Sequence, residues 1–93
     1  MITAIVFVHV TSDKIPEVAE QIAAIEGISE VYSVTGRIDL IAIVRVRSFE
    51  AVAEIVSDRL AKVAGVLDTE THLAFRAFSQ HDLDAAFSLG DVD

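Results

Sequence analysis

The chain has 93 residues, enough for one domain built around one hydrophobic core. Apolar residues make up 53% of it and the mean hydropathy is +0.52, which is high because so small a domain buries only about 60% of its unfolded surface. We therefore expect further copies of the chain to cover the surplus. The formal net charge is −8, and a nucleic-acid-binding protein needs a cluster of basic residues to contact the phosphates. We therefore expect no direct nucleic-acid partner.

The chemistry that the composition allows is narrow. There is no cysteine, which excludes disulfides and thiolate chemistry. His9, His72 and His81 form none of the paired spacings of metal sites, so we expect neither a metal nor a cofactor. The apolar residues 1–10 have no basic leader or cleavage site and are about half as long as a membrane span, so we expect a cytoplasmic protein with no membrane partner.

The first expected elements are a strand and an amphipathic helix. Residues 3–10 form a near-continuous apolar, β-branched run, typical of a strand covered on both faces. Residues 11–13 offer helix N-caps, Pro16 suits a first helical turn, and Gly27 is a natural helix end. Between them the apolar positions step by three and four residues, which predicts one buried face; they are Ile15, Val18, Ala19, Ile22 and Ile25.

A β-hairpin is expected next. Residues 28–35 form a strand, and residues 35–39 form a tight turn in which Gly36 suits a positive φ. The following strand, residues 40–47, alternates, with Ile41 and Ile43 on one face and Leu40, Ala42, Val44 and Val46 on the other. The short connection predicts antiparallel pairing.

A second helix and a last strand complete the pattern. Ser48 is the expected N-cap, Glu50 suits the first turn, and Gly65 ends the helix. Its buried stripe is predicted at Phe49, Val52, Val56, Leu60 and Val63. Residues 66–78 predict a long strand, and residues 79–93 a tail with a short amphipathic helix.

The order β-α-β-β-α-β predicts an α+β fold, a ferredoxin-like sandwich with two helices on one face of a four-stranded antiparallel sheet. It covers residues 1–78, and we do not expect the first and last strands to be direct neighbours. The first strand is apolar on both faces and neither face of the last is wholly polar. We therefore expect two sheets to pair in a dimer.

The sharpest local feature combines the hairpin turn with two threonines. A tight glycine turn presents backbone N–H groups that suit a carboxylate, and Asp39 could accept hydrogen bonds from an ammonium group. Thr69 and Thr71 lie two apart on a strand and point to the same side. Together these groups match an α-amino acid. The same residues also suit an ordinary hairpin and strand, so both interpretations stay open.

The same residues also resemble the motifs of a known protein family. The run VYSVTGRIDL at residues 31–40, followed by Gly65-Val66 and Thr69-Glu70-Thr71, resembles the ligand-binding (RAM) domain of Lrp/AsnC transcription factors. The family pattern is a V-x-G-x-x-D hairpin, then glycine-valine before a T-x-T strand. The resemblance covers about residues 1–78 and is to short, stand-alone members that lack the helix-turn-helix half.

The resemblance implies a non-catalytic regulatory module that binds an amino acid between subunits, in sheet-paired dimers that assemble into octamer-like rings. Residue by residue, it places ligand binding at Gly36, Arg37, Ile38, Asp39, Thr69 and Thr71. Arg37 departs from the acidic or amide residue of many relatives, and either pairs with a ligand carboxylate or fills the site. The output would pass through a partner, for which a full-length Lrp/AsnC-type regulator is the obvious choice.

Two other functions stay open at this point. A small dimeric ferredoxin-like enzyme, of the monooxygenase or isomerase type, would use His9 or His72 with a nearby carboxylate inside the cavity between sheet and helices. A purely structural oligomer would have no ordered ligand pocket. The location of the polar pocket distinguishes these alternatives.

Overall fold

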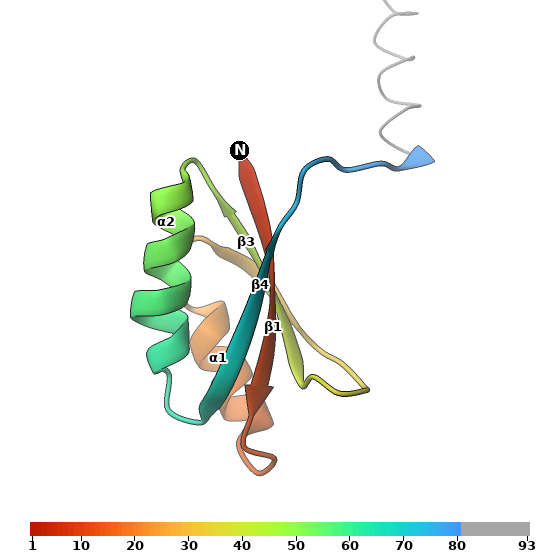
Figure 1. Ribbon diagram of the computed structural model, residues 1–93. Helices are drawn as coiled ribbons and strands as arrows, with labels where there is room; N and C mark the ends of the chain where they lie inside the picture. The colour runs from red at the N-terminus through yellow and green to blue at the C-terminus, as the bar shows by residue number, and fades with distance from the viewer. Residues whose placement is uncertain (81–93) are drawn as a thin grey trace, which may run out of the picture.

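The computed structural model describes residues 1–80 and has the expected ferredoxin-like α+β architecture (Figure 1). The sheet order is β2-β3-β1-β4, with every neighbouring pair antiparallel, and the helices cover one face. No helix among residues 1–80 is long and apolar enough to cross a membrane. The elements are β1 (Ile2–Val10), α1 (Ile15–Ala23), β2 (Ile28–Ser33), β3 (Leu40–Val46), α2 (Phe49–Ala53), its π-helical continuation η1 (Glu54–Arg59), the 3₁₀ turn η2 (Leu60–Lys62) and β4 (Val66–Leu73).

The core lies between the sheet and the helices and is wholly apolar in the described part of the chain. Alternate residues of β1 and β3 point into it, as the period of two requires. Burial of these side chains is the main force holding the two layers together. The buried side chains are Ala4, Val6, Val8, Val10, Val18, Ile22, Ile28, Leu40, Ala42, Val44, Val52, Ile55, Val56 and Leu60.

The other face of the sheet carries no helix (Figure 1). Ile5, Phe7, Ile41 and Ile43 are only half-buried there, so β1 is covered on one face within a single subunit. We call this surface the open face. From the strand register it consists of Thr3, Ile5, Phe7, His9, Glu30, Tyr32, Ile41, Ile43, Arg45, Asp68, Glu70 and His72.

The prediction that the first and last strands are not neighbours is wrong. β4 pairs directly with β1, with Val8 opposite Thr69 and Val6 opposite Thr71. The crossover from β3 through the second helix passes over β1, so β1 lies between β3 and β4. The polar residues of β4 therefore lie beside those of β1.

The predicted N-cap is found at the start of α2 but not at the start of α1. Ser48 caps α2 as predicted, since its Oγ accepts a hydrogen bond from Ala51 N at 3.1 Å. Residues 11–13 do not cap α1: Lys14 holds the N-cap position without a side-chain bond. Instead Thr11 N–H donates to Gly65 O at 2.9 Å and Thr11 O accepts from Lys14 N, which uses this segment as a turn.

One predicted buried position and one predicted strand end are wrong. Phe49 is 62% exposed, because it directly follows the N-cap, and Ile55 takes its place in the buried stripe. β4 ends at Leu73, short of the predicted residue 78, because its partner strand β1 begins at Ile2. Phe75 and Phe78 lie beyond it and are exposed. The tail helix predicted within residues 79–93 falls almost entirely outside the described residues.

Candidate functional site

The hairpin turn is fixed to the end of β1 through Asp39. The backbone N–H of Asp39 donates a hydrogen bond to Val8 O at 3.1 Å, and Asp39 Oδ2 accepts one from Val10 N at 2.9 Å. Its carbonyl accepts from Val34 N at 3.0 Å, closing the turn. One oxygen of the proposed ammonium acceptor thus has a structural partner, while Oδ1 accepts no hydrogen bond from the described residues.

The tip of the turn is open. Gly36 has a φ of +110°, as predicted, and a Cβ built there would meet nothing within 4 Å. Arg37 is exposed and has no ion pair within residues 1–80. Within the same range, the N–H groups of Gly36, Arg37 and Ile38 donate to nothing. A fixed turn with several free donors can receive an anionic group.

Thr69 and Thr71 lie on the helix-side face of β4, at the edge of the sheet. Neither hydroxyl forms a hydrogen bond within the described chain. Thr71 borders a shallow, mostly apolar cavity of about 370 Å³ shared with Leu73 and one side of α2. Because β1 separates β4 from β3, the threonines lie about 10 Å from the hairpin strand. One subunit does not join the two halves of the predicted site.

The sequence interpretation named His9 but missed its position between two carboxylates. Its Nδ1 lies 3.9 Å from Asp39 Oδ2 and its Nε2 lies 3.9 Å from Asp68 Oδ1. The expectation that the first and last strands lie apart hid this contact, which the strand order of the ferredoxin-like fold would have revealed. The contact places His9 on the open face, next to the base of the turn.

His72 also lies on the open face, where it pairs with Glu70 and packs against Phe7 with ring centroids 5.1 Å apart. The enzyme alternative required a histidine inside the cavity between sheet and helices. No polar or charged residue among residues 1–80 is buried in that interior. Both histidines point to the opposite side of the sheet, so the geometry does not match that alternative. Within the same residues no group of three or more His, Cys, Asp or Glu could hold a metal ion.

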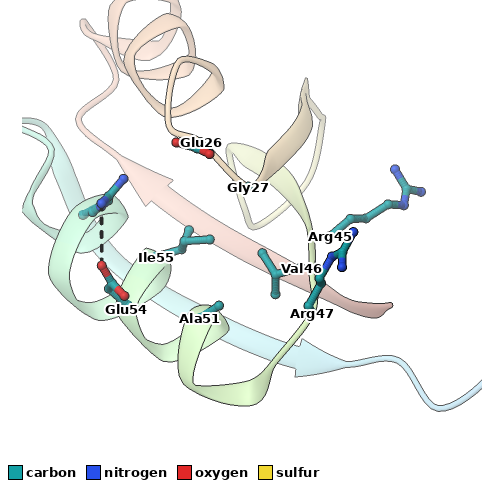
Figure 2. Close-up of a pocket in the computed structure, with 9 residues that line it drawn as sticks. Glu26, Gly27, Arg45, Val46, Arg47, Ala51, Glu54 and Ile55 are labelled. Atoms are coloured by element: carbon teal, nitrogen blue, oxygen red, sulfur yellow. Dashed lines mark ion pairs between the residues drawn. The ribbon is translucent and has the colours of Figure 1, made fainter.

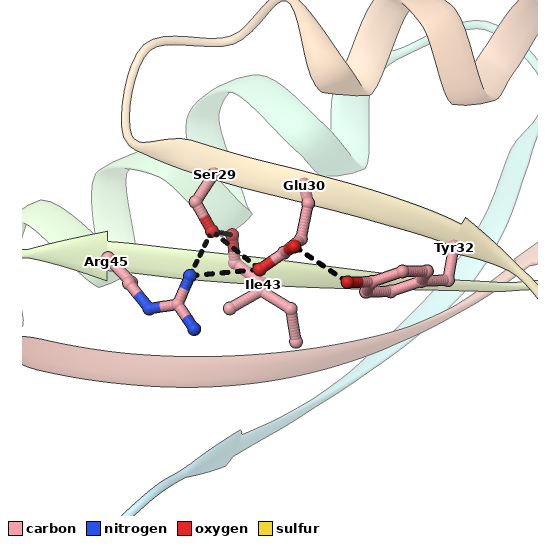
Figure 3. Close-up of polar contacts among 5 residues, drawn as sticks. All are labelled: Ser29, Glu30, Tyr32, Ile43 and Arg45. Carbon is pink, nitrogen blue, oxygen red and sulfur yellow. Dashed lines mark hydrogen bonds and ion pairs between the residues drawn. The ribbon is translucent and has the colours of Figure 1, made fainter. Parts of the chain in front are cut away.

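A polar network occupies the β2 side of the open face (Figure 3). Tyr32 Oη donates to Glu30 Oε2 at 2.7 Å, and Arg45 Nη1 contacts Glu30 Oε1 at 3.0 Å and Ser29 Oγ at 2.7 Å. The hydrogen bond from Tyr32, then the one from Arg45, lowers the pKa of Glu30. The bond to Glu30 raises the pKa of Tyr32. The apolar centre of the open face therefore has charged groups at both edges.

A second cavity, of about 500 Å³, lies at the end of β3 away from the turn (Figure 2). Its wall includes Gly27, Val46, Arg47 and Ile55. No sequence motif pointed to it, because its residues come from the link after α1, the end of β3 and the second helix. Only the folded chain brings these segments together.

Comparison with known proteins agrees with the fold and the motifs. The Lrp/AsnC ligand binding domain model matches residues 3–83. The HTH-type transcriptional regulator YugG of Bacillus subtilis is 35% identical over 95 residues, which cover 99% of this chain and 56% of YugG. The chain thus spans about half the length of that regulator.

Solved structures show the same relationship. TTHA0845 from Thermus thermophilus is 40% identical with a TM-score of 0.81, over 86% of this chain and all of that one. The regulator NMB0573 of Neisseria meningitidis, in complex with L-Met, has a TM-score of 0.76 at 17% identity, over 85% of this chain and 53% of that one. The turn motif, the T-x-T strand, the fold and these matches together show that this chain belongs to the Lrp/AsnC ligand-binding domain family, a regulatory module of transcriptional regulators.

Proposed function

We propose that this chain senses an amino acid, which binds between subunits. Binding of this ligand would then be coupled to the oligomeric state of the chain. The turn of one subunit and the T-x-T strand of a neighbour would each supply half of the site. The observation that carries the proposal is the turn itself, which Asp39 ties to β1 while leaving three backbone N–H groups and one carboxylate oxygen free within residues 1–80. Fixed donors are pre-organised, so ligand binding loses little entropy in ordering them.

The chemistry of the turn fits an α-amino acid. The N–H groups of Gly36, Arg37 and Ile38 suit the ligand carboxylate, and the guanidinium of Arg37 adds a positive charge beside them. Asp39 Oδ1 suits the ammonium group. The hydroxyls of Thr69 and Thr71 from a neighbouring subunit complete the polar contacts. The L-Met complex of NMB0573 supports an amino acid as the class of ligand, through the shared fold.

The open face supports assembly. Its half-buried Ile5, Phe7, Ile41 and Ile43 would be covered by the same face of a second copy. Further contacts between such dimers, in an octamer-like ring, would bring a turn to the T-x-T strand of another subunit. A ligand that bridges subunits stabilises the assembly that forms its site, so occupancy shifts the oligomeric state.

The output would pass through a partner that reads DNA. The acidic charge of this chain disfavours direct contact with DNA. A full-length Lrp/AsnC-type regulator has a sheet of the same kind, so mixed assembly through the open face would place the sensor beside a DNA-binding subunit. Amino-acid binding would then change which mixed assemblies form.

The test is thermal unfolding with each of the twenty amino acids at millimolar concentration, followed by calorimetric titration of any that stabilise. A ligand at a hundred times its Kd adds about 2.7 kcal/mol to the free energy of unfolding, which raises Tm by roughly 10–20 °C. Asp39→Asn keeps an acceptor for Val10 N but removes the negative charge, and we expect it to reduce the shift markedly. Glu20→Gln, on exposed α1, is the matched control. A shift of undiminished size in Asp39→Asn, or no shift with any amino acid, would contradict the proposal.

A further inference from the structure

The cavity at Gly27 lies at the opposite end of the sheet from the turn. β3 runs from Leu40, next to the turn, to Val46 in the cavity wall, a distance of about 20 Å. The volume of the cavity, about 500 Å³, falls within the range of small-molecule sites. A ligand there would be separate from one bound at Gly36.

Gly27 shapes the floor of this cavity. Its φ is +97°, and a Cβ at this position would collide with the Ile55 side chain and lie 3.1 Å from Val46 Cγ1. Gly27 O accepts a hydrogen bond from Arg45 N at 3.0 Å, which fixes the link to β3. Because the glycine has no side chain, Val46 and Ile55 approach the link and form an aliphatic base, to which Ala51 adds.

The rim carries charges of both signs, two of them without partners in the described chain (Figure 2). Arg59 pairs with Glu54 at 3.6 Å, and Arg45 pairs with Glu30 on the open face. Arg47 and Glu26, in contrast, form no ion pair or hydrogen bond with any residue between 1 and 80. They come from different elements, the end of β3 and the link after α1, and face the same cavity.

We propose that this cavity is a second ligand site, which takes a small zwitterion with an aliphatic side chain. Arg47 binds the carboxylate. Glu26 binds the ammonium group. The aliphatic part lies over Val46 and Ile55, where it displaces water from an apolar surface. A ligand with only one of the two charges leaves either Arg47 or Glu26 unpaired and binds more weakly.

The test uses isoleucine δ1-methyl NMR of the 93-residue chain, which reports on each site separately. Ile55 lies in the Gly27 cavity and Ile38 in the hairpin turn. The probes are L-leucine, 4-methylpentanoate without the ammonium group, and 3-methylbutylamine without the carboxylate. We expect L-leucine to move the Ile55 signal saturably, and each singly charged probe to bind at least roughly tenfold more weakly.

Variants assign the contacts. Arg47→Gln and Glu26→Gln should each weaken the Ile55 response to L-leucine roughly tenfold or more. Arg76→Gln and Glu20→Gln remove the same charges outside the cavity and should leave it unchanged. An Ile55 signal that stays still while Ile38 moves would overturn this second site and leave the turn site standing. An Ile55 response that is equal in Arg47→Gln would also overturn it. Movement of Ile55 alone would support this site and count against the turn.

Discussion

The Asp39 carboxylate accepts a hydrogen bond from the backbone N–H of Val10 at 2.9 Å, across 29 positions of sequence. This bond joins the β2–β3 turn to the C-terminal end of β1, and the bond from Asp39 N to Val8 O reinforces it. The aspartate of the family motif thus has a structural role in this chain, and its Oδ1 accepts no hydrogen bond from residues 1–80.

Asp39→Ala should destabilise the fold by about 1–3 kcal/mol, because it leaves the N–H of the buried residue Val10 without an acceptor. Asp39→Asn should lower the free energy of unfolding clearly less, since the amide oxygen of asparagine can still accept the hydrogen bond from Val10 N. Urea unfolding of the two variants and the wild type measures the difference. Equal losses in both variants would show that the charge, and not the hydrogen bond, holds the turn.

Gly27→Ala and Gly36→Ala separate backbone strain from crowding. Both positions have a positive φ, so each substitution should cost about 1–2 kcal/mol for the left-handed backbone. At Gly27 the added methyl group also meets Ile55, which should add roughly 1–3 kcal/mol. At Gly36 it meets open space. In thermal unfolding, the Tm of Gly27→Ala should therefore be well below that of Gly36→Ala. A lower Tm for Gly36→Ala would be inconsistent with this packing.

Ile5→Glu tests self-association through the open face. Ile5 lies at its centre, between Ile43 of β3 and His72 of β4. A carboxylate buried there without a partner should weaken subunit pairing roughly a hundredfold or more. Sedimentation velocity measures the change, and circular dichroism checks that the variant folds. Ala23→Glu, at an exposed position of α1, is the control. Unchanged assembly of Ile5→Glu would rule out the open face as the interface.

The pH dependence of the Glu30 network has a definite sign. Because Tyr32 and Arg45 lower the pKa of Glu30, its contribution is present above the ordinary glutamate pKa and is lost as the pH falls through the folded value. Wild type should therefore lose its stability advantage over Glu30→Gln at acidic pH. Unfolding of both proteins from acidic to neutral pH checks this, and a constant difference would argue against the network.

Much of the fold follows from local sequence, and the exceptions have physical causes. Glycine positions, the Ser48 cap and the alternation of β3 depend on neighbouring residues, and all were predicted correctly. The end of β4 depends on where β1 begins, far earlier in the chain, so apolar content alone placed it too far along. The solvent-facing Phe49 shows that the first residue after a cap need not join the buried stripe.

The candidate site was predicted only in part. The turn lies where the motif placed it, but the bond from Val10 to Asp39 and the approach of His9 to Asp68 depend on strand order. The Gly27 cavity combines three separate segments, and no local pattern records such a meeting. Residues that act through distant contacts need the folded chain to be recognised.

The sharing of one ligand site between subunits is tested most directly by mixing two variants. Asp39→Asn removes the negative charge of the turn and Thr71→Val removes a hydroxyl of the strand, so each protein alone should bind the stabilising amino acid at the shared site much more weakly than the wild type does. Co-refolded, the two should regain part of the wild-type calorimetric binding, since some sites then combine an intact turn with an intact strand. Absence of any recovery in the mixture, with assembly intact, would contradict a ligand site shared between subunits.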